Sequence, residues 1–141
     1  MDYRILEDDA TADLAIEAYG NNLRQAFENS AMAICESISD TSKIDEQEIK
    51  LVNKKAENIQ MLLYEFLEEI LYFHDSDNLV FKRVIVQELD EKNPSISAIF
   101  YGENFDKKKH ESKAHIKAIT YHKMSIIKEK GKAIIKFIVD I

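Results

Sequence analysis

The residues with the clearest chemical potential stand at the end of the chain, where Asp140 is followed by Ile141. Residues 133–139 are almost entirely apolar, which predicts a strand buried on both faces. The side chain of Asp140 and the carboxylate of the last residue would then lie together at the end of a rigid strand. Two such hard oxygen donors could form half of a cation site. The alternative is a core strand that ends at the surface in charged groups and binds nothing, and the residues alone leave both interpretations open.

No other set of residues forms a complete catalytic or metal-binding motif. His110, His115 and His122 lack the spacing of a zinc site, and Cys35 has no evident histidine partner. His122 is predicted to lie on a strand, where a hydrogen-bonded structural role is the more common one. Residues 75–77, Asp-Ser-Asp, resemble the start of a calcium loop. The oxygen donor and the glycine that such a loop needs further along are absent, so we interpret this segment as a turn.

The composition is typical of one soluble globular domain in the cytoplasm. The chain has 141 residues, of which 45% are hydrophobic and 32% charged. It contains no apolar run long enough to cross a membrane, and its first residues do not have the basic and then apolar pattern of a secretory signal. A single cysteine in a chain without a signal indicates a reducing compartment.

The net charge argues against strong direct binding of nucleic acid. It is −7, whereas a protein that neutralises phosphates usually carries a basic excess. The chain has only three glycines, and neither of the glycine-rich phosphate-binding motifs occurs. The run of three lysines at residues 107–109 is better interpreted as a solvated surface than as an RNA-binding patch.

The apolar periodicity predicts two helices within a largely antiparallel sheet. Asn22 is a candidate N-cap, with Gln25 three residues later, for a helix whose apolar stripe runs to Ile38. Asn58 is the candidate N-cap of a second helix with a wider apolar stripe. The predicted strands are residues 3–6, 14–19, 48–52, 79–89, 95–101, 116–127 and 132–141. The expected architecture is α+β, with a sheet of about seven or eight strands on which two helices pack.

Short segments that match one protein family occur in order along nearly the whole chain. The most specific are Tyr101-Gly-Glu103 followed by Asp106 and His110, and the stretch of residues 116–122, Ile-Lys-Ala-Ile-Thr-Tyr-His. The other matching segments are residues 11–13, 18–20, 23–31, 62–67, 71–72, 79–81 and 139–141. In this ordered set the chain resembles the archeases, and the resemblance implies a single archease-like domain over residues 1–141.

The resemblance also implies a function that composition could not show. Archeases assist the RNA-splicing ligase, which joins a phosphate-terminated RNA end to a hydroxyl-terminated one during tRNA processing. They promote guanylylation of that ligase and its multiple turnover, and they are not themselves ligases. The implied role is therefore that of a non-catalytic activator whose partner is the ligase protein.

The metal site of the family matches Asp13, Asp140 and Ile141. Asp13 begins one predicted strand and Asp140 ends another, so a sheet could bring them together. An all-oxygen donor set is typical of Ca²⁺, which we expect as the cofactor, with Mg²⁺ and Mn²⁺ as alternatives. The resemblance thus favours the cation-site interpretation of the chain end.

Three further residues are candidates for metal or partner contacts. Asp40 could be an additional ligand or simply a cap at a helix end, and Lys117 could touch a partner or be an exposed strand lysine. His122 is the third, and it would be the only base near the metal. The chain departs from the family at Ala10, where many members have histidine.

Two functions from other classes remain alternatives at this stage. The chain could be a chaperone or adaptor for RNA-modifying enzymes such as methyltransferases, with a purely structural metal. It could also be a metal-dependent hydrolase, although that reaction needs an activating base beside the metal and His122 is an unconvincing one.

Overall fold

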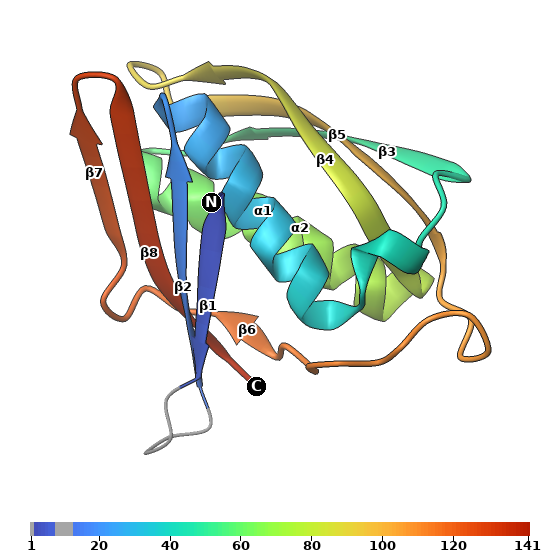
Figure 1. The fold of residues 1–141 in the computed structure, drawn as a ribbon. Coiled ribbons are helices and arrows are strands. Elements are labelled where there is room, and N and C mark those ends of the chain that lie inside the picture. The colour runs from blue at the N-terminus through green and yellow to red at the C-terminus, as the bar shows by residue number, and fades with distance from the viewer. Residues whose placement is uncertain (1, 8–12) are drawn as a thin grey trace.

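A computed structural model describes residues 2–7 and 13–141 of the chain (Figure 1). Within these residues it contains eight strands, two α-helices and one short 3₁₀-helix, which confirms the α+β class. The elements in chain order are β1 (Tyr3–Glu7), β2 (Leu14–Gly20), α1 (Leu23–Ile38), η1 (Thr41–Lys43), β3 (Glu48–Lys55), α2 (Ile59–Asp77), β4 (Leu79–Asp90), β5 (Ser95–Asn104), β6 (Ala118–Ile119), β7 (Ser125–Glu129) and β8 (Lys132–Asp140).

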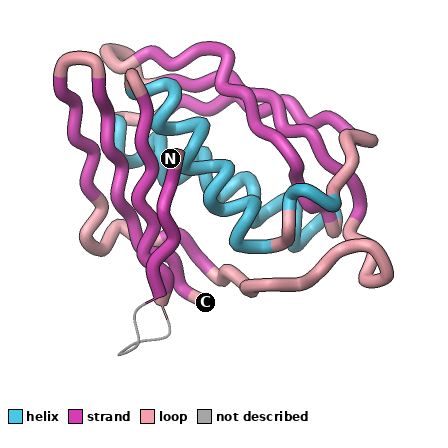
Figure 2. The backbone as a smooth tube through the Cα atoms, viewed as in Figure 1, coloured by secondary structure: helices cyan, strands magenta, loops and turns pink. Residues whose placement is uncertain are grey.

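The strands divide between two antiparallel sheets, and the helices lie between them (Figures 1 and 2). The first sheet has the order β1-β2-β8-β6, and β7 also pairs with β8; the second has the order β3-β5-β4. Each sheet therefore buries one face against the helices, as a two-sided core requires. No helix in the described part of the chain is long and apolar enough to cross a membrane.

Strand β8 lies in the interior of the first sheet but is not buried on both faces, which corrects the expectation from its apolar sequence. Phe137 and Val139 face the helices and are fully buried, whereas Lys136 is exposed and Ile138 is half-buried. The burial alternates because only one face of the sheet is covered by helices. In β8 the apolar residues on the outer face are therefore only partly shielded.

Both predicted helix starts are confirmed by their cap geometry. The side chain of Asn22 accepts a hydrogen bond from the amide of Gln25 at 2.9 Å, and Asn58 accepts one from Met61 at 2.8 Å. Each cap satisfies a backbone donor that the first helical turn leaves unpaired. Helix α2 continues through Asp77, so residues 75–77 form its last turn and not a loop.

The strand predicted over residues 116–127 is broken into β6 and β7, which is a correction. Lys123 adopts a left-handed backbone conformation with φ of 57°, and the amide of Met124 bonds to the carbonyl of Tyr121 at 3.1 Å. This tight turn separates two short strands that both pair with β8. His122 is consequently exposed in the turn and does not lie on a strand.

Candidate functional site

The start of β2 and the end of β8 meet at one end of the first sheet, close to the marked C-terminus in Figure 1. Leu14 of β2 pairs with Val139 of β8, and both are buried. Asp13 and Asp140 are the next residues along this register. If the register continued by one residue, Asp13 would lie opposite Asp140, and directly opposed residues of antiparallel strands carry their side chains on the same face. Asp140 is exposed and Asp13 is half-buried.

Ile141 and Lys117 complete this end of the sheet. Asp140 pairs with Ala118 of β6, and the amide of Lys117 donates a hydrogen bond to the carbonyl of Asp140 at 2.8 Å. The side chain of Ile141 packs against the edge of the hydrophobic core, whereas Lys117 is exposed. The backbone of the last strand is thus held firmly on both sides.

A groove of about 940 Å³ opens beside these residues. Its apolar floor comes from the first sheet, and one wall comes from the polar connection between β5 and β6. The lining residues are Ile5, Leu14, Ser37, Glu111, Ser112, Lys113, Ala114, His115, Lys117 and Ile141. The predicted site residues Ile141 and Lys117 therefore share one concave surface next to Asp140.

The donors at this end of the sheet fit a hard cation better than a soft one. Asp13 and Asp140 would supply carboxylate oxygens, and Ile141 a main-chain oxygen, which is the chemistry that Ca²⁺, Mg²⁺ and Mn²⁺ prefer. Among the described residues, no group of three or more His, Cys, Asp or Glu side chains is placed to hold a metal ion. A cation held here would therefore keep several coordination positions open to water or to a partner.

Asp40 and His122, both within the described residues, do not line this groove. The Asp40 carboxylate accepts hydrogen bonds from the hydroxyl of Ser42 at 2.7 Å and from its amide at 3.0 Å. These bonds, the hydroxyl bond first, hold the pKa of Asp40 below its usual value. Asp40 thus caps η1, which is the role that the sequence offered as the alternative to metal binding.

A buried histidine–glutamate pair, to which the sequence assigned no role, anchors the connection that walls the groove. His110 is only 4% exposed, and its Nδ1 accepts a hydrogen bond from the amide of Asp106 at 2.9 Å. Nε2 must then carry the hydrogen, and it donates to Glu103 at 2.8 Å. Further along, the amide of Lys113 bonds to the carbonyl of Ile38 at 3.0 Å, which ties the connection to the end of α1.

Glu103 is the centre of this anchor. One of its oxygens accepts bonds of 2.8 Å from the Asp45 amide, the Lys109 ammonium and the His110 ring. Burial alone would raise the pKa of Glu103, but these hydrogen bonds outweigh it, with that from Lys109 the strongest, and lower the pKa to about 2. The sequence alone shows only how far apart Glu103 and His110 are along the chain, and such a spacing does not reveal a contact.

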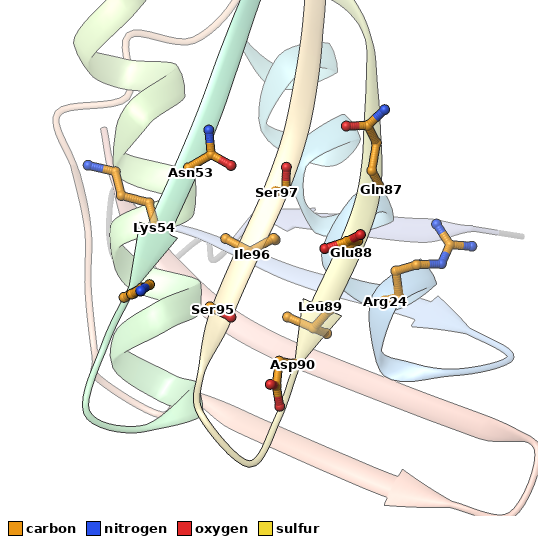
Figure 3. A pocket seen from close by; sticks show the side chains of 11 residues that line it. Arg24, Asn53, Lys54, Gln87, Glu88, Leu89, Asp90, Ser95, Ile96 and Ser97 are labelled. Atoms are coloured by element: carbon orange, nitrogen blue, oxygen red, sulfur yellow. The ribbon is translucent and has the colours of Figure 1, made fainter.

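A second hollow, of about 830 Å³, lies on the three-stranded sheet and is shown in Figure 3. Polar side chains of β3, β4 and β5 face it, with Arg24 of α1 at one side. Arg24 is engaged by the carbonyl of Val86 at 2.8 Å and by Glu28 at 3.4 Å. The lining mixes lysine, carboxylate, amide and hydroxyl groups.

Comparison with known proteins identifies the family. A model of the archease protein family matches residues 3–141. The chain belongs to the archease family. It is 41% identical over 131 residues to the protein archease of Sulfurisphaera tokodaii, covering 93% of this chain and 94% of that protein. It is 43% identical over 136 residues to the protein archease of Sulfolobus acidocaldarius, covering 94% and 95%.

Solved archease structures share the fold. The solution structure of protein 1598 from Methanobacterium thermoautotrophicum covers 99% of both chains, with a TM-score of 0.80 and 31% identity. The crystal structure of an archease from Thermotoga maritima, described as a possible chaperone, has a TM-score of 0.65 and 19% identity, and covers 98% of this chain and 96% of its own. The latter similarity shows the fold alone. Ala10, the residue at which the sequence suggested a departure from the family, lies outside the described residues.

Proposed function

We propose that this archease is a non-catalytic activator of the tRNA-splicing RNA ligase that promotes ligase guanylylation and multiple turnover. The observation that supports this most is the pairing of Leu14 with Val139, because Asp13 and Asp140 are the next residues beyond this pair at one end of the sheet. We call Asp13, Asp140 and Ile141 the acidic tip. A pair of carboxylates at the end of a sheet suits contact with the active site of a larger enzyme.

In this proposal the acidic tip acts by charge and position and forms no bond with the RNA. Asp13, Asp140 and the main chain of Ile141 would hold a divalent cation, most simply Ca²⁺, which neutralises charge on a nucleotide phosphate when bound. Phosphoryl-type transfer depends mainly on positioning and electrostatic stabilisation, so a helper that supplies both can accelerate it. Lys117, exposed beside Asp140, would contact the ligase or the same phosphate.

The test is ligation with the cognate ligase, GTP, Mn²⁺ and an excess of RNA ends. We expect wild-type protein to convert a single round of ligation into many rounds, and Asp140→Ala and Asp13→Ala to lose that stimulation. The matched control is Glu88→Ala, because Glu88 is an exposed carboxylate of β4 in the second sheet. Stimulation by Asp13→Ala equal to that of wild type would contradict the proposed site.

The second candidate is a chaperone or adaptor for RNA-modifying enzymes such as methyltransferases, with a structural metal. The Thermotoga maritima protein that shares this fold is described as a possible chaperone. Affinity capture from the source cells distinguishes the two functions. Recovery of a methyltransferase without the ligase would favour the adaptor, and recovery of the ligase would favour the activator.

A further inference from the structure

Two exposed tyrosines, Tyr72 and Tyr121, and the partly buried Tyr64 lie on α2 and on the turn after β6. Tyr72 of α2 is 60% exposed, and Tyr121, in the turn after β6, is 50% exposed. The ring of Tyr121 stacks on that of Tyr64 with centroids 4.5 Å apart and an angle of 11° between the planes. Exposed and pre-ordered aromatic rings of this kind are enriched where proteins meet partners.

The helix that carries two of these rings is strongly acidic. It contains five carboxylates and no lysine or arginine. Lys54 of β3 pairs with Glu69, and Lys50 lies 3.9 Å from Asp77. Within the described chain no lysine or arginine forms an ion pair with the other three carboxylates, which are Glu65, Glu68 and Asp75.

The carboxylates and two of the rings line one hollow, so they belong to one surface. The interaction with Glu68, and then burial, raise the pKa of Tyr64. Burial and then the nearby Glu65 carboxylate raise the pKa of Tyr121. A hollow of about 530 Å³ runs over this surface, and its lining residues are Lys54, Tyr64, Glu65, Glu68, Glu69, Leu71, Tyr72, Asp75 and Lys117. We call the set Tyr64, Tyr72, Tyr121, Glu65, Glu68 and Asp75 the tyrosine–carboxylate face.

We propose that the tyrosine–carboxylate face binds an arginine-bearing basic segment of a protein partner. A guanidinium group stacks on an aromatic ring and at the same time donates paired hydrogen bonds to a carboxylate. Tyr72 and Tyr121 offer exposed rings, and Glu65, Glu68 and Asp75 offer carboxylates without a resident cation. A nucleic acid would bring phosphates against these carboxylates, so the charge favours a basic protein segment over RNA.

This surface is distinct from the acidic tip, although Lys117 lines both hollows. A partner that engages the acidic tip could therefore also reach the tyrosine–carboxylate face. The inference goes beyond the proposed function, because it does not depend on the identity of the partner as a ligase.

The experiment measures binding of a labelled Arg-Gly-Ser repeat peptide by fluorescence anisotropy and maps it by NMR on the full chain. Matched peptides with lysine in place of arginine, and a single-stranded RNA, are the comparison ligands. We expect the arginine peptide to bind most tightly and to shift resonances of α2 and of the turn at Tyr121. Glu65→Lys should weaken its binding about tenfold, and Tyr72→Ala roughly threefold.

The control is Glu88→Lys, which makes the same charge change on the second sheet and should alter binding less than about twofold. Thermal melting of each variant establishes that it is folded. Equal weakening by Glu88→Lys would overturn the proposal, because binding would then follow net charge alone. Absence of peptide binding, shifts spread over the whole surface, or RNA bound at α2 would overturn it as well.

Discussion

At the residue scale, the only cysteine of the chain is held in an inert state. Cys35 is 2% exposed, and its burial in α1, with a smaller contribution from Glu36, raises the pKa of its thiol to about 12. The thiolate is the reactive form, so almost none is present at neutral pH. Cys35 is a structural thiol, as its place in the apolar pattern predicted.

We expect native protein to resist a thiol-specific reagent such as a disulfide dye at pH 7.5. The same protein in denaturant should react with one equivalent within minutes, because unfolding restores an ordinary thiol. The chain has a single cysteine, so the absorbance change reports this residue alone. Rapid labelling of native protein would show that α1 opens locally far more often than its burial implies.

The Glu103 anchor should make stability depend on pH in acid. Its pKa is about 2 in the folded protein against an ordinary value of 4.5, so the unfolded chain takes up the proton first as the pH falls. The contribution of Glu103 to the free energy of unfolding is therefore complete above about pH 4.5 and is lost toward pH 2. For this side chain, which is 12% exposed, the contribution amounts to about 3 kcal/mol.

Chemical denaturation of wild type and Glu103→Gln between pH 7 and pH 2 measures this contribution. Wild type should lose more free energy of unfolding across the range from pH 4.5 downward than the variant does. Glu88→Gln, an exposed carboxamide control in β4, should keep the wild-type slope. Parallel pH profiles for wild type and Glu103→Gln would show that this anchor does not titrate as described.

At the element scale, α2 is the central helix of the core. Its face toward the sheets consists of residues that are no more than 4% exposed, which are Leu62, Leu63, Phe66, Leu67, Ile70 and Leu71. Leu67→Ala should lower the free energy of unfolding by roughly 2–5 kcal/mol, because it removes buried contacts and leaves a cavity. Gln60→Ala on the exposed face of the same helix should change it by less than about 0.5 kcal/mol in thermal or denaturant melts.

The sequence predicted elements best where a local signal marks them. Asn22 and Asn58 indicated where the two helices begin, because an N-cap side chain bonds to the backbone of the turn that follows it. The break between β6 and β7 was missed, because Lys123 takes a left-handed conformation without a glycine to signal it. The bulges of β4, at residues 81–83 and 86–88, likewise leave no mark in the apolar pattern.

The residues of the candidate site likewise divide into those that the sequence could suggest and those that it could not. The sequence could suggest that Asp13 and Asp140 lie at the same end of the sheet, because each flanks a strand and a sheet aligns strand ends. The partnership of Glu103 with His110 and Lys109 was not, because it arises only when the polar connection folds back on β5. Asp40 and His122 lie outside the groove for local reasons, since one caps η1 and the other sits in a turn.

At the scale of the whole molecule, the two sheets differ in how far apart in the chain their strands come from. The three-stranded sheet is built from β3, β4 and β5, and two of these form a simple hairpin. The five-stranded sheet joins β1 and β2 at the start of the chain to β8 near its end. The division into two sheets could not be seen in the order of elements, because that order does not specify which distant strands pair.

The pairing of β2 with β8 has a kinetic consequence. Closing a loop that spans nearly the whole chain costs conformational entropy before any contact repays it, so such pairings form late. The hairpin of β4 and β5 can pack against α2 first, and the β2–β8 ladder would form after it. The strand ends next to Asp13 and Asp140 come together only in that last step. If the acidic tip holds a cation as proposed, metal affinity would appear only in chains that have finished folding, and the cation would slow the unfolding of the five-stranded sheet.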